Sequence, residues 1–275
     1  MSGLLGASEI REIATRIGVN PTKKLGQNFV VDANTCRRIV KSADVEKTDV
    51  ALEIGPGLGS LTLALLESAS RVIAIEIDPR LAGELPTTAT RHGFDINNLE
   101  VINADAMELE PLDPAPTVLV ANLPYNISVP VLLRAFEKLP SLRTGVVMVQ
   151  SEVADRLVAK PGTKNYGSPS VKASWWGSLV PAGNVSRSIF WPVPNVDSSL
   201  VRFDRHDVPG DEALRLKTFA LIDGAFAQRR KMLRGALSER LGSSASAIIE
   251  SAGVDPTARG EALLLEDFIR IAQAH

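Results

Sequence analysis

Apolar and polar positions alternate in blocks through the first half of the chain. Between Val50 and Gln150, short apolar runs with few internal charges are separated by stretches with helical spacing. In chain order the blocks are VALEIG, SLTLALLES, RVIAIEID, LEVINAD, TVLVANLP, VPVLLRAFEKL and GVVMVQSEV. This rhythm is typical of consecutive βα units, and strands with few charges are typical of sheets buried on both faces. The pattern predicts an α/β fold with a mostly parallel sheet covered by helices on both sides.

The pattern changes after Ser151. Two further strands are predicted, VKASWW at 171–176 and SSLVRF at 198–203, on either side of the Pro-rich stretch PVPNV. We expect these two strands to complete the sheet at one edge.

The C-terminal part of the chain is helical in pattern. Residues 206–212, HDVPGDE, have the composition of a linker, and the helical pattern that follows is broken by Gly and Pro stops. The sequence therefore predicts two domains, an α/β domain over residues 1–205 and a small helical domain over residues 206–275.

Composition limits the chemistry that the chain can perform. Its 275 residues are 45% hydrophobic and 23% charged, which is close to the average for globular proteins. Cys36 is the only cysteine, so no intramolecular disulfide, zinc–cysteine cluster or Cys-x-x-Cys pair can form. No stretch reaches the ~18 consecutive apolar residues of a membrane span, and charges interrupt the N-terminus where a signal peptide needs an apolar run. We expect a cytoplasmic protein without a metal site.

Charge distribution is more informative than the net charge of -2. Seven basic and two acidic residues lie between Arg215 and Arg240, and a smaller basic excess lies near the N-terminus. Such clusters neutralise nucleic-acid phosphates, although solvated helix faces carry similar charges. The candidate RNA-binding residues are Lys23, Lys24, Arg229, Arg230, Lys231 and Arg234.

A glycine-rich turn follows the first predicted strand. Gly55, Gly57 and Gly59 lie between that strand and the next helix, where a ligand can approach the backbone closely. Glu76 follows Gly55 by 21 positions, the separation at which a carboxylate can accept hydrogen bonds from ribose hydroxyls. A dinucleotide site needs G-x-G-x-x-G, and here the third glycine comes one residue early. The form E-x-G-x-G-x-G, which begins at Glu53, resembles the S-adenosylmethionine loop of Rossmann-like methyltransferases. A purely structural turn and a nicotinamide site are the alternatives.

A second acidic residue follows a later strand. Asp105 lies at the carboxyl end of the third predicted strand, where open α/β sheets bind their ligands. The loop resemblance implies that it receives the adenine amino group of the cofactor. An Asp at this position also suits a helix N-cap, which is the alternative.

The tetrapeptide Asn122-Leu123-Pro124-Tyr125 ends the fourth predicted strand. Its pattern is shared by methyltransferases that act on planar amino groups. The lone pair of such a nitrogen is delocalised, and acceptors for both N–H groups favour a more tetrahedral, nucleophilic nitrogen. The Asn122 side-chain oxygen and a carbonyl at Leu123 or Pro124 can supply these acceptors, because proline restricts the backbone around it. Tyr125 offers a ring on which a flipped base can stack. The alternative is a structural Asn-Pro turn.

A second aromatic residue precedes a proline-rich loop. Phe190 begins the stretch FWPVPNVDSS, whose prolines lower the entropic cost of presenting a ring. We expect Phe190 to stack on the target base opposite Tyr125, with a core position as the alternative.

With these motifs in view, the chain resembles the KsgA-type ribosomal RNA adenine dimethyltransferases over nearly its whole length. The shared stretches are KLGQNF, EIGPGLGSLT, the Glu76 strand, NADAME, NLPYNIS, VQSEVADRL, KNYG, FWPVPNVDSS and QRRKMLR. The resemblance implies a Rossmann-like class I methyltransferase that uses S-adenosylmethionine. It implies two methyl groups on N6 of each of two adjacent adenosines near the 3′ end of small-subunit (16S) rRNA.

The resemblance also implies residue roles. An N-terminal arm, residues 1–45, would close over the cofactor, Gly55 would contact its methionine part, and Asn122 would touch both cofactor and target. The implied cofactor-binding residues are Gln27, Asn28, Val30, Gly55, Gly57, Glu76, Asp105 and Asn122. The helical domain would dock on a pre-ribosomal 30S particle. Apart from the resemblance, a monomer is the simplest expectation for the oligomeric state. Leu25 and Val30 depart from the family pattern but remain apolar.

Two other functions compete with this interpretation. Large-subunit rRNA adenine methyltransferases of the antibiotic-resistance type share the glycine loop and the Asn-x-Pro-aromatic tetrapeptide. A ribosome-assembly factor that mainly binds would keep the basic segment but would not need Asn122.

Overall fold

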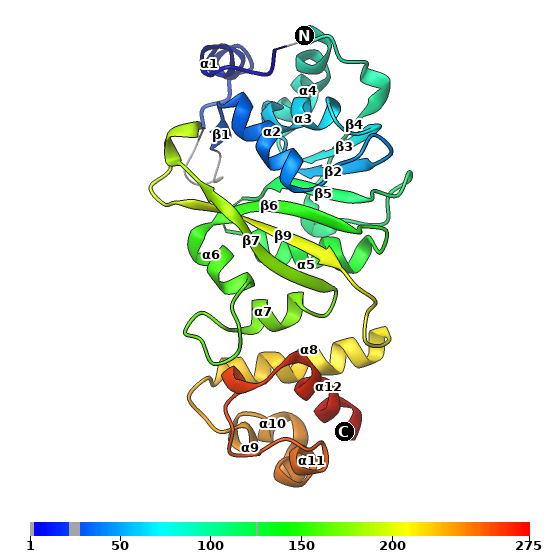
Figure 1. Ribbon diagram of the computed structural model, residues 1–275, viewed down its shortest axis with the longest axis vertical. Coiled ribbons are helices and arrows are strands. Elements are labelled where there is room, and N and C mark those ends of the chain that lie inside the picture. Colours follow the sequence, from blue (N-terminus) through cyan, green and yellow to red (C-terminus); the bar gives the residue numbers. More distant parts are fainter. Residues whose placement is uncertain (1–2, 22–27, 125) are drawn as a thin grey trace. The chain divides into compact units, whose positions relative to one another are not determined.

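The computed structural model describes residues 3–21, 28–124 and 126–275. The chain forms two compact units (Figure 1). The first comprises Met1–Ala154 and Val180–Arg205, and the second comprises Asp155–Leu179 and His206–His275. The second unit thus includes a segment, Asp155–Leu179, that the sequence analysis assigned to the first domain. The functional division at residue 205 stays a prediction.

The first unit is built on a mostly parallel sheet, as the sequence predicts. Within the described residues this sheet has seven strands in the order β4-β3-β2-β5-β6-β9-β7. Neighbouring strands from β4 to β6 are parallel, and β9 is antiparallel to β6. The strands are β2 (Val50–Ile54), β3 (Arg71–Glu76), β4 (Leu99–Asn103), β5 (Val118–Asn122), β6 (Thr144–Gln150), β7 (Gly177–Val185) and β9 (Ser198–Arg205).

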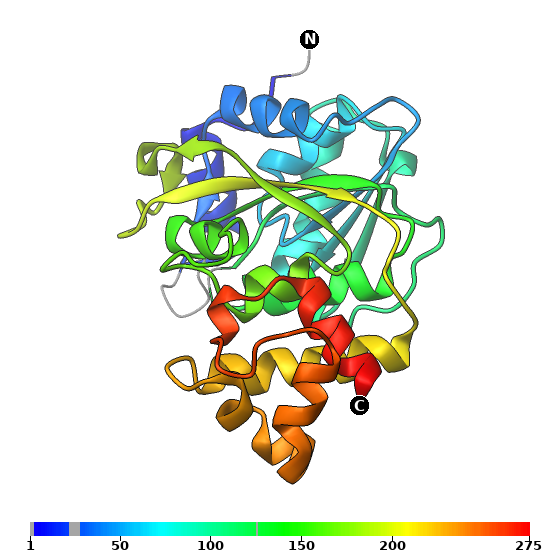
Figure 2. The ribbon, with the colours of Figure 1, turned by 60° about the horizontal axis from the view of Figure 1, so that its bottom comes forward.

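Helices cover both faces of this sheet (Figure 2). On one face, apolar residues of α2 (Ala33–Ser42) and α3 (Ser60–Leu66) pack in one cluster with Leu200 of β9. Phe203, three positions along, lies on the opposite face, where its ring meets that of Phe136 edge-on at 4.6 Å. Phe136 belongs to α5 (Ser128–Lys138). The other helices of this unit are α1 (Ala7–Arg16) and α4 (Pro79–Arg91), and α6 (Ser151–Leu157) begins in it.

One of the two predicted edge strands is wrong. Residues 198–203 lie in β9, but the stretch 171–176 contains the end of α7 (Ser168–Ala173) and a turn, and β7 begins only at Gly177. Pro169, in the first turn of α7, favours a helix start. The rings of Trp175 and Trp176 pack edge-on against Phe219, so they are core residues of the second unit. A short apolar run is compatible with either a strand or a buried helix, and in this structure its first residues are helical.

The second unit is helical, as predicted. Its longest helix, α8 (Glu212–Ala227), begins at the N-cap Asp211, whose carboxylate accepts a hydrogen bond from Leu214 N. The apolar face of α12 (Leu265–Ala274) is buried, and Phe268 packs beside Phe226 of α8. The shorter helices are α9 (Leu233–Ala236), α10 (Ser238–Leu241) and α11 (Ala245–Ser251).

Short elements complete the chain. In a two-stranded sheet, β1 (Phe29–Val30) pairs antiparallel with β8 (Phe190–Trp191). Among the described residues, the 3-10 helices are η2 (Ile96–Asn98), η3 (Ala106–Glu108), η4 (Arg187–Ile189), η5 (Gly242–Ser244) and η6 (Gly260–Ala262). Within the described part of the chain, no helix has the length and apolarity needed to cross a bilayer.

Candidate functional site

The strand order places the two main sequence motifs side by side. The chain leaves β2 toward β3 on one side and returns with β5 on the other, so β2 and β5 flank the switch point of the sheet. Open α/β sheets bind ligands at the carboxyl ends of such strands. A Cβ built on Gly55, directly after β2, would lie 3.7 Å from the carbonyl oxygen of Asn122 at the end of β5. The glycine turn and the Asn-Leu-Pro segment therefore meet.

The glycines of this turn adopt a backbone conformation in which any side chain is strained. Gly55, Gly57 and Gly59 have φ angles of +72°, +58° and +99°. A Cβ on Gly57 would lie 2.9 Å from the Phe29 ring, and one on Gly59 would lie 2.7 Å from Leu85 Cδ1. The sequence assigned Gly57 to the cofactor loop because a ligand can approach a glycine backbone closely. In the structure, the Phe29 ring also packs close to this glycine.

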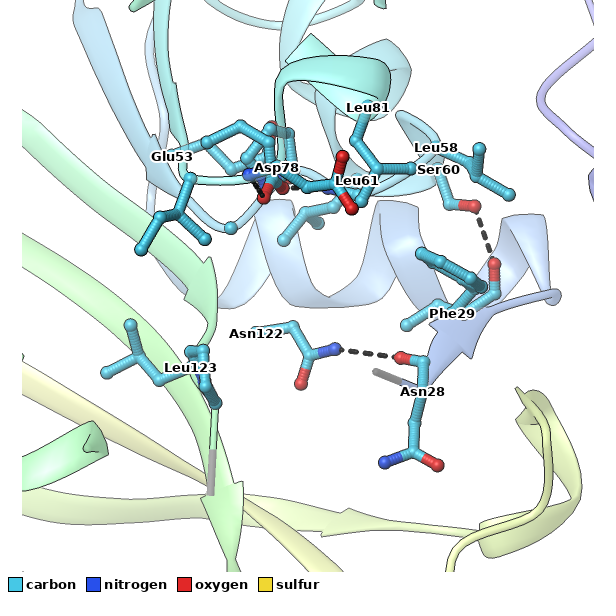
Figure 3. Close-up of a pocket in the computed structure, with 17 residues that line it drawn as sticks. Asn28, Phe29, Glu53, Leu58, Ser60, Leu61, Asp78, Leu81, Asn122 and Leu123 are labelled. Atoms are coloured by element: carbon cyan, nitrogen blue, oxygen red, sulfur yellow. Dashed lines mark hydrogen bonds between the residues drawn. The ribbon is translucent and has the colours of Figure 1, made fainter. Parts of the chain in front are cut away.

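An open cavity lies over the two strand ends (Figure 3). The empty space of the cavity, counted together with its open mouth, is about 860 Å³. Its lining residues are Asn28, Phe29, Val30, Glu53, Gly55, Pro56, Gly57, Leu58, Ser60, Leu61, Glu76, Ile77, Asp78, Leu81, Asn122, Leu123 and Pro124.

Glu76, the last residue of β3, is held in one orientation. Backbone N–H groups donate to both of its carboxylate oxygens, Gly57 N to Oε2 at 3.1 Å and Asp78 N to Oε1 at 3.0 Å. Burial raises the pKa of Glu76, and these two hydrogen bonds oppose that shift. The carboxylate is therefore fixed in place at the cavity wall before any ligand arrives.

Glu53, on the neighbouring strand β2, is a second buried carboxyl in the cavity wall. Its side chain accepts a hydrogen bond from Thr62 Oγ1 at 2.6 Å. Burial raises the pKa of Glu53 to about 8, with the charge of Glu76 adding to the shift and the Thr62 bond opposing it. Glu53 is therefore protonated over most of the acidic and neutral range.

We expect Glu53→Gln to stabilise the protein increasingly as pH rises. The pKa of Glu53 in the fold is about 8, above its ordinary value of 4.5. Proton binding therefore stabilises the fold fully below pH 4.5, and this contribution is lost as pH rises through 8. Above pH 8 the wild type carries a buried charge that the glutamine lacks. The difference in free energy of unfolding should therefore grow by a few kcal/mol, as an order of magnitude, between pH 5 and 9.

Denaturant unfolding of both proteins across this pH range measures the difference. Glu108→Gln, at an exposed position in η3, is the control. A Glu53→Gln advantage that stays constant with pH would contradict the assignment.

Asn122 is anchored through its amide nitrogen. Nδ2 donates to the carbonyl oxygen of Asn28 at 3.2 Å, and the side-chain oxygen points into the space between Asn28 and Leu123 (Figure 3). Leu123 N donates to Met148 O, which continues the sheet ladder, and Pro124 O accepts a bond from Ile127 N. These backbone hydrogen bonds hold the residues after β5 in place. Such a fixed backbone suits a site in which a carbonyl oxygen must accept a hydrogen bond from a ligand in a defined direction.

Other residues predicted for the site have different outcomes. Asn28 and Val30 line the cavity, whereas Asp105 does not: its carboxylate caps η3 by accepting from Met107 N at 2.9 Å. The N-cap alternative thus describes this structure, and adenine recognition stays a prediction. Four candidates lie outside the described residues, namely Lys23, Lys24, Gln27 and Tyr125.

Phe190 is not at the cavity. Its side chain is 2% exposed and belongs to the apolar cluster that contains Val30 and Leu200. Packing with Val30 of β1 and Leu200 of β9 places this ring in the core of the structure, and the stacking role expected for Phe190 stays a prediction. The core alternative describes the residue.

Nine lining residues were not among the predicted site residues, namely Phe29, Glu53, Pro56, Leu58, Ser60, Leu61, Ile77, Asp78 and Leu81. Phe29 lies in the KLGQNF stretch, but nothing in the sequence signalled its contact with Gly57. Asp78 had a signal, because an Asp before Pro79 is typical of a helix N-cap and therefore lies near the Glu76 strand end.

The basic segment divides into engaged and exposed residues. Arg229 Nε donates to Glu261 Oε2 at 2.8 Å, and its Nη2 donates to Lys164 O at 2.9 Å. Arg215 is 8% exposed and lies over the ring of Phe219. Arg230, Lys231 and Arg234 are exposed in the second unit. Within the described residues, no group of three or more His, Cys, Asp or Glu is arranged to hold a metal ion.

The chain is similar to known proteins over nearly its whole length. The family model described as "Ribosomal RNA adenine dimethylase" matches residues 18–275. A protein named ribosomal RNA small subunit methyltransferase A from Kineococcus radiotolerans is 58% identical, over 99% of this chain and 92% of its own. A protein of the same name from Leifsonia xyli is also 58% identical, over 98% of both chains.

Solved structures share the architecture. A dimethyladenosine transferase from Plasmodium falciparum aligns with a TM-score of 0.74 at 26% identity, over 88% of this chain and 95% of its own. The 23S rRNA methyltransferase ErmE aligns with a TM-score of 0.66 at 28% identity, over 90% of this chain and 99% of its own. These alignments support the class I methyltransferase fold predicted from the sequence.

Proposed function

The chain belongs to the ribosomal RNA adenine dimethylase family, and we propose that it dimethylates N6 of two adjacent adenosines near the 3′ end of small-subunit (16S) rRNA. It is an S-adenosylmethionine-dependent enzyme. One observation carries the assignment of the site: Asn122 and the glycine turn line a single cavity at the switch point of the sheet. Methyl transfer requires the methyl donor and the acceptor nitrogen to lie next to each other, and a single cavity lined by both motifs allows this.

The cavity suits the cofactor in shape and chemistry. The fixed Glu76 carboxylate can accept hydrogen bonds from both hydroxyls of a ribose, because its orientation needs no rearrangement. Gly55 and Gly57 line the cavity, so a ligand there can approach the backbone of the turn, and the glycine spacing differs from that of a dinucleotide site. When bound, S-adenosylmethionine supplies an electrophilic methyl group on a cationic sulfur.

Asn122 prepares the acceptor nitrogen. Its Oδ1 accepts a hydrogen bond from one N6–H group of the target adenine. A backbone carbonyl of Leu123 or Pro124 accepts a hydrogen bond from the other N6–H group. The Nδ2 bond to Asn28 fixes the amide so that oxygen faces the cavity. No strong base is required before transfer, because the nitrogen loses its proton after it becomes cationic. Tyr125 is proposed as the stacking platform for the base.

The small subunit is favoured over the large subunit as substrate. The relatives that are 58% identical are named for the small subunit, whereas the structure of ErmE, named for 23S rRNA, is 28% identical. Primer extension on rRNA from cells with and without the gene tests this choice. Loss of two adjacent modified adenosines near the 3′ end of 16S rRNA is expected, and loss confined to 23S rRNA would defeat the proposal.

We infer that Arg230, Lys231 and Arg234 contact RNA phosphates within a pre-ribosomal 30S particle, while Arg229 braces the segment through Glu261. Replacing the three exposed residues by Ala should weaken RNA binding and reduce the salt slope by about one unit per lost phosphate contact. Arg229→Ala should instead lower the melting temperature. Binding isotherms on 16S rRNA at several salt concentrations measure the slope, and an unchanged slope would show that the three residues are merely solvated.

A further inference from the structure

A polar chain of contacts leads from the cavity to the end of α1. Asp78, at the N-terminus of α4, donates its backbone N–H to Glu76 Oε1, one of the two bonds that fix this carboxylate. The side chain of Asp78 is held in turn by Arg80, whose Nε and Nη2 donate to its two oxygens at 3.1 and 2.7 Å. The third donor of Arg80, Nη1, reaches the carbonyl oxygen of Gly18 at 2.8 Å.

Packing of α1 fixes the position of Gly18, which accepts the hydrogen bond from Arg80. Ile10, Ile13 and Ala14 of α1 are buried in one apolar cluster with Leu58 and Leu81, which also line the cavity. Arg16, in the last turn of α1, makes a second bidentate pair with Glu84 of α4 at 2.6 and 3.0 Å. Gly18 therefore offers Arg80 a fixed acceptor.

Arg80 itself does not line the cavity, and its side chain is 50% exposed. A surface ion pair alone contributes little to stability. Here the guanidinium spans three acceptors on two segments, a planar fork geometry that an ammonium group cannot reproduce. Arg80 also neutralises the charge of Asp78, which otherwise raises the pKa of Glu76 in the same wall.

We propose that Arg80 is a positioning residue for cofactor binding: by clamping Asp78 to the end of α1, it holds the Glu76 carboxylate in its ribose-accepting orientation. The proposal rests on the proposed role of Glu76 in that site. Because Arg80 lies outside the cavity wall, its effect must pass through Asp78 to Glu76.

The test is a double-mutant cycle measured by calorimetry with S-adenosylhomocysteine on the full chain. Glu76→Ala should weaken binding on the order of 100-fold, and Arg80→Ala on the order of ten-fold, since each disturbs hydrogen bonds to a charged group. In the Glu76→Ala background, Arg80→Ala should change affinity less than two-fold. Arg80→Lys should restore only part of the loss.

Kinetics on small subunits give the second readout. The KM for S-adenosylmethionine should rise in Arg80→Ala while kcat stays within about two-fold. Arg71→Ala, which removes the partly exposed ion pair of Arg71 in β3 with Glu100 in β4, is the matched control and should leave both constants unchanged.

The outcomes are distinguishable. The inference about Arg80 would be overturned if Arg80→Ala bound S-adenosylhomocysteine within two-fold of wild type. It would also be overturned if the affinity losses of the two single variants multiplied in the double variant. In both cases Glu76 would keep its proposed role. Glu76→Ala that binds like wild type would overturn the proposed role of Glu76 and this inference with it.

Discussion

Asn122→Ala should reduce the rate of methyl transfer by on the order of 100-fold or more while leaving small-subunit binding within about two-fold of wild type. The side-chain oxygen is the acceptor that tunes the target nitrogen, and losing one preorganised polar group at a reacting centre typically costs this much in kcat. RNA affinity depends instead on phosphate contacts elsewhere on the protein. Single-turnover transfer and filter binding on the same subunits measure the two quantities.

Asn98→Ala, at an exposed position in η2, serves as the matched control and should behave as wild type. Thermal melting verifies that Asn122→Ala is folded. If a folded variant loses binding and transfer in equal measure, Asn122 belongs to the RNA interface rather than to the chemistry. Full transfer activity in Asn122→Ala would remove the residue from the mechanism altogether.

Gly57→Ala should weaken cofactor binding by about 10- to 100-fold. Two physical effects combine here, namely a φ of +58° and a Cβ placed 2.9 Å from the ring of Phe29, another residue of the cavity wall. Backbone strain and overpacking each cost about 1–3 kcal/mol, and relief requires the ring or the turn to move into the ligand space. Calorimetry with S-adenosylhomocysteine measures the affinity.

Gly93→Ala separates the two effects. Gly93 has a similar φ of +80°, but a Cβ there would meet nothing within 4 Å. This control should lower the melting temperature slightly and leave cofactor affinity intact. Comparable affinity losses in both variants would mean that the close approach of Phe29 is irrelevant to the site.

The sequence predicted the elements of the site that depend on local pattern. The βα rhythm fixed the sheet type, and the glycine turn and Asn122 were predicted to lie at strand ends because each follows an apolar run directly. Their adjacency then follows from the topology of an open parallel sheet, whose ligand edge gathers the carboxyl ends of its strands.

Features that depend on tertiary packing could not be predicted in this way. Phe190 was expected to face a ligand, yet pairing of β8 with β1 brings it into the core. The stretch 171–176 had strand-like residues, but contacts with Phe219 of a distant helix decide its structure. Arg80 carried no signal at all, because its importance comes from Gly18, 62 positions earlier.

The central claim is that this chain moves a methyl group from S-adenosylmethionine to adenine N6 of small-subunit rRNA. Its most direct test is incubation of the purified protein with tritiated cofactor and unmethylated small subunits, followed by nucleoside analysis of the rRNA. We expect label in N6,N6-dimethyladenosine, on two adjacent residues near the 3′ end. Label absent from the small subunit, or recovered in any nucleoside other than N6-methylated adenosine, would contradict it.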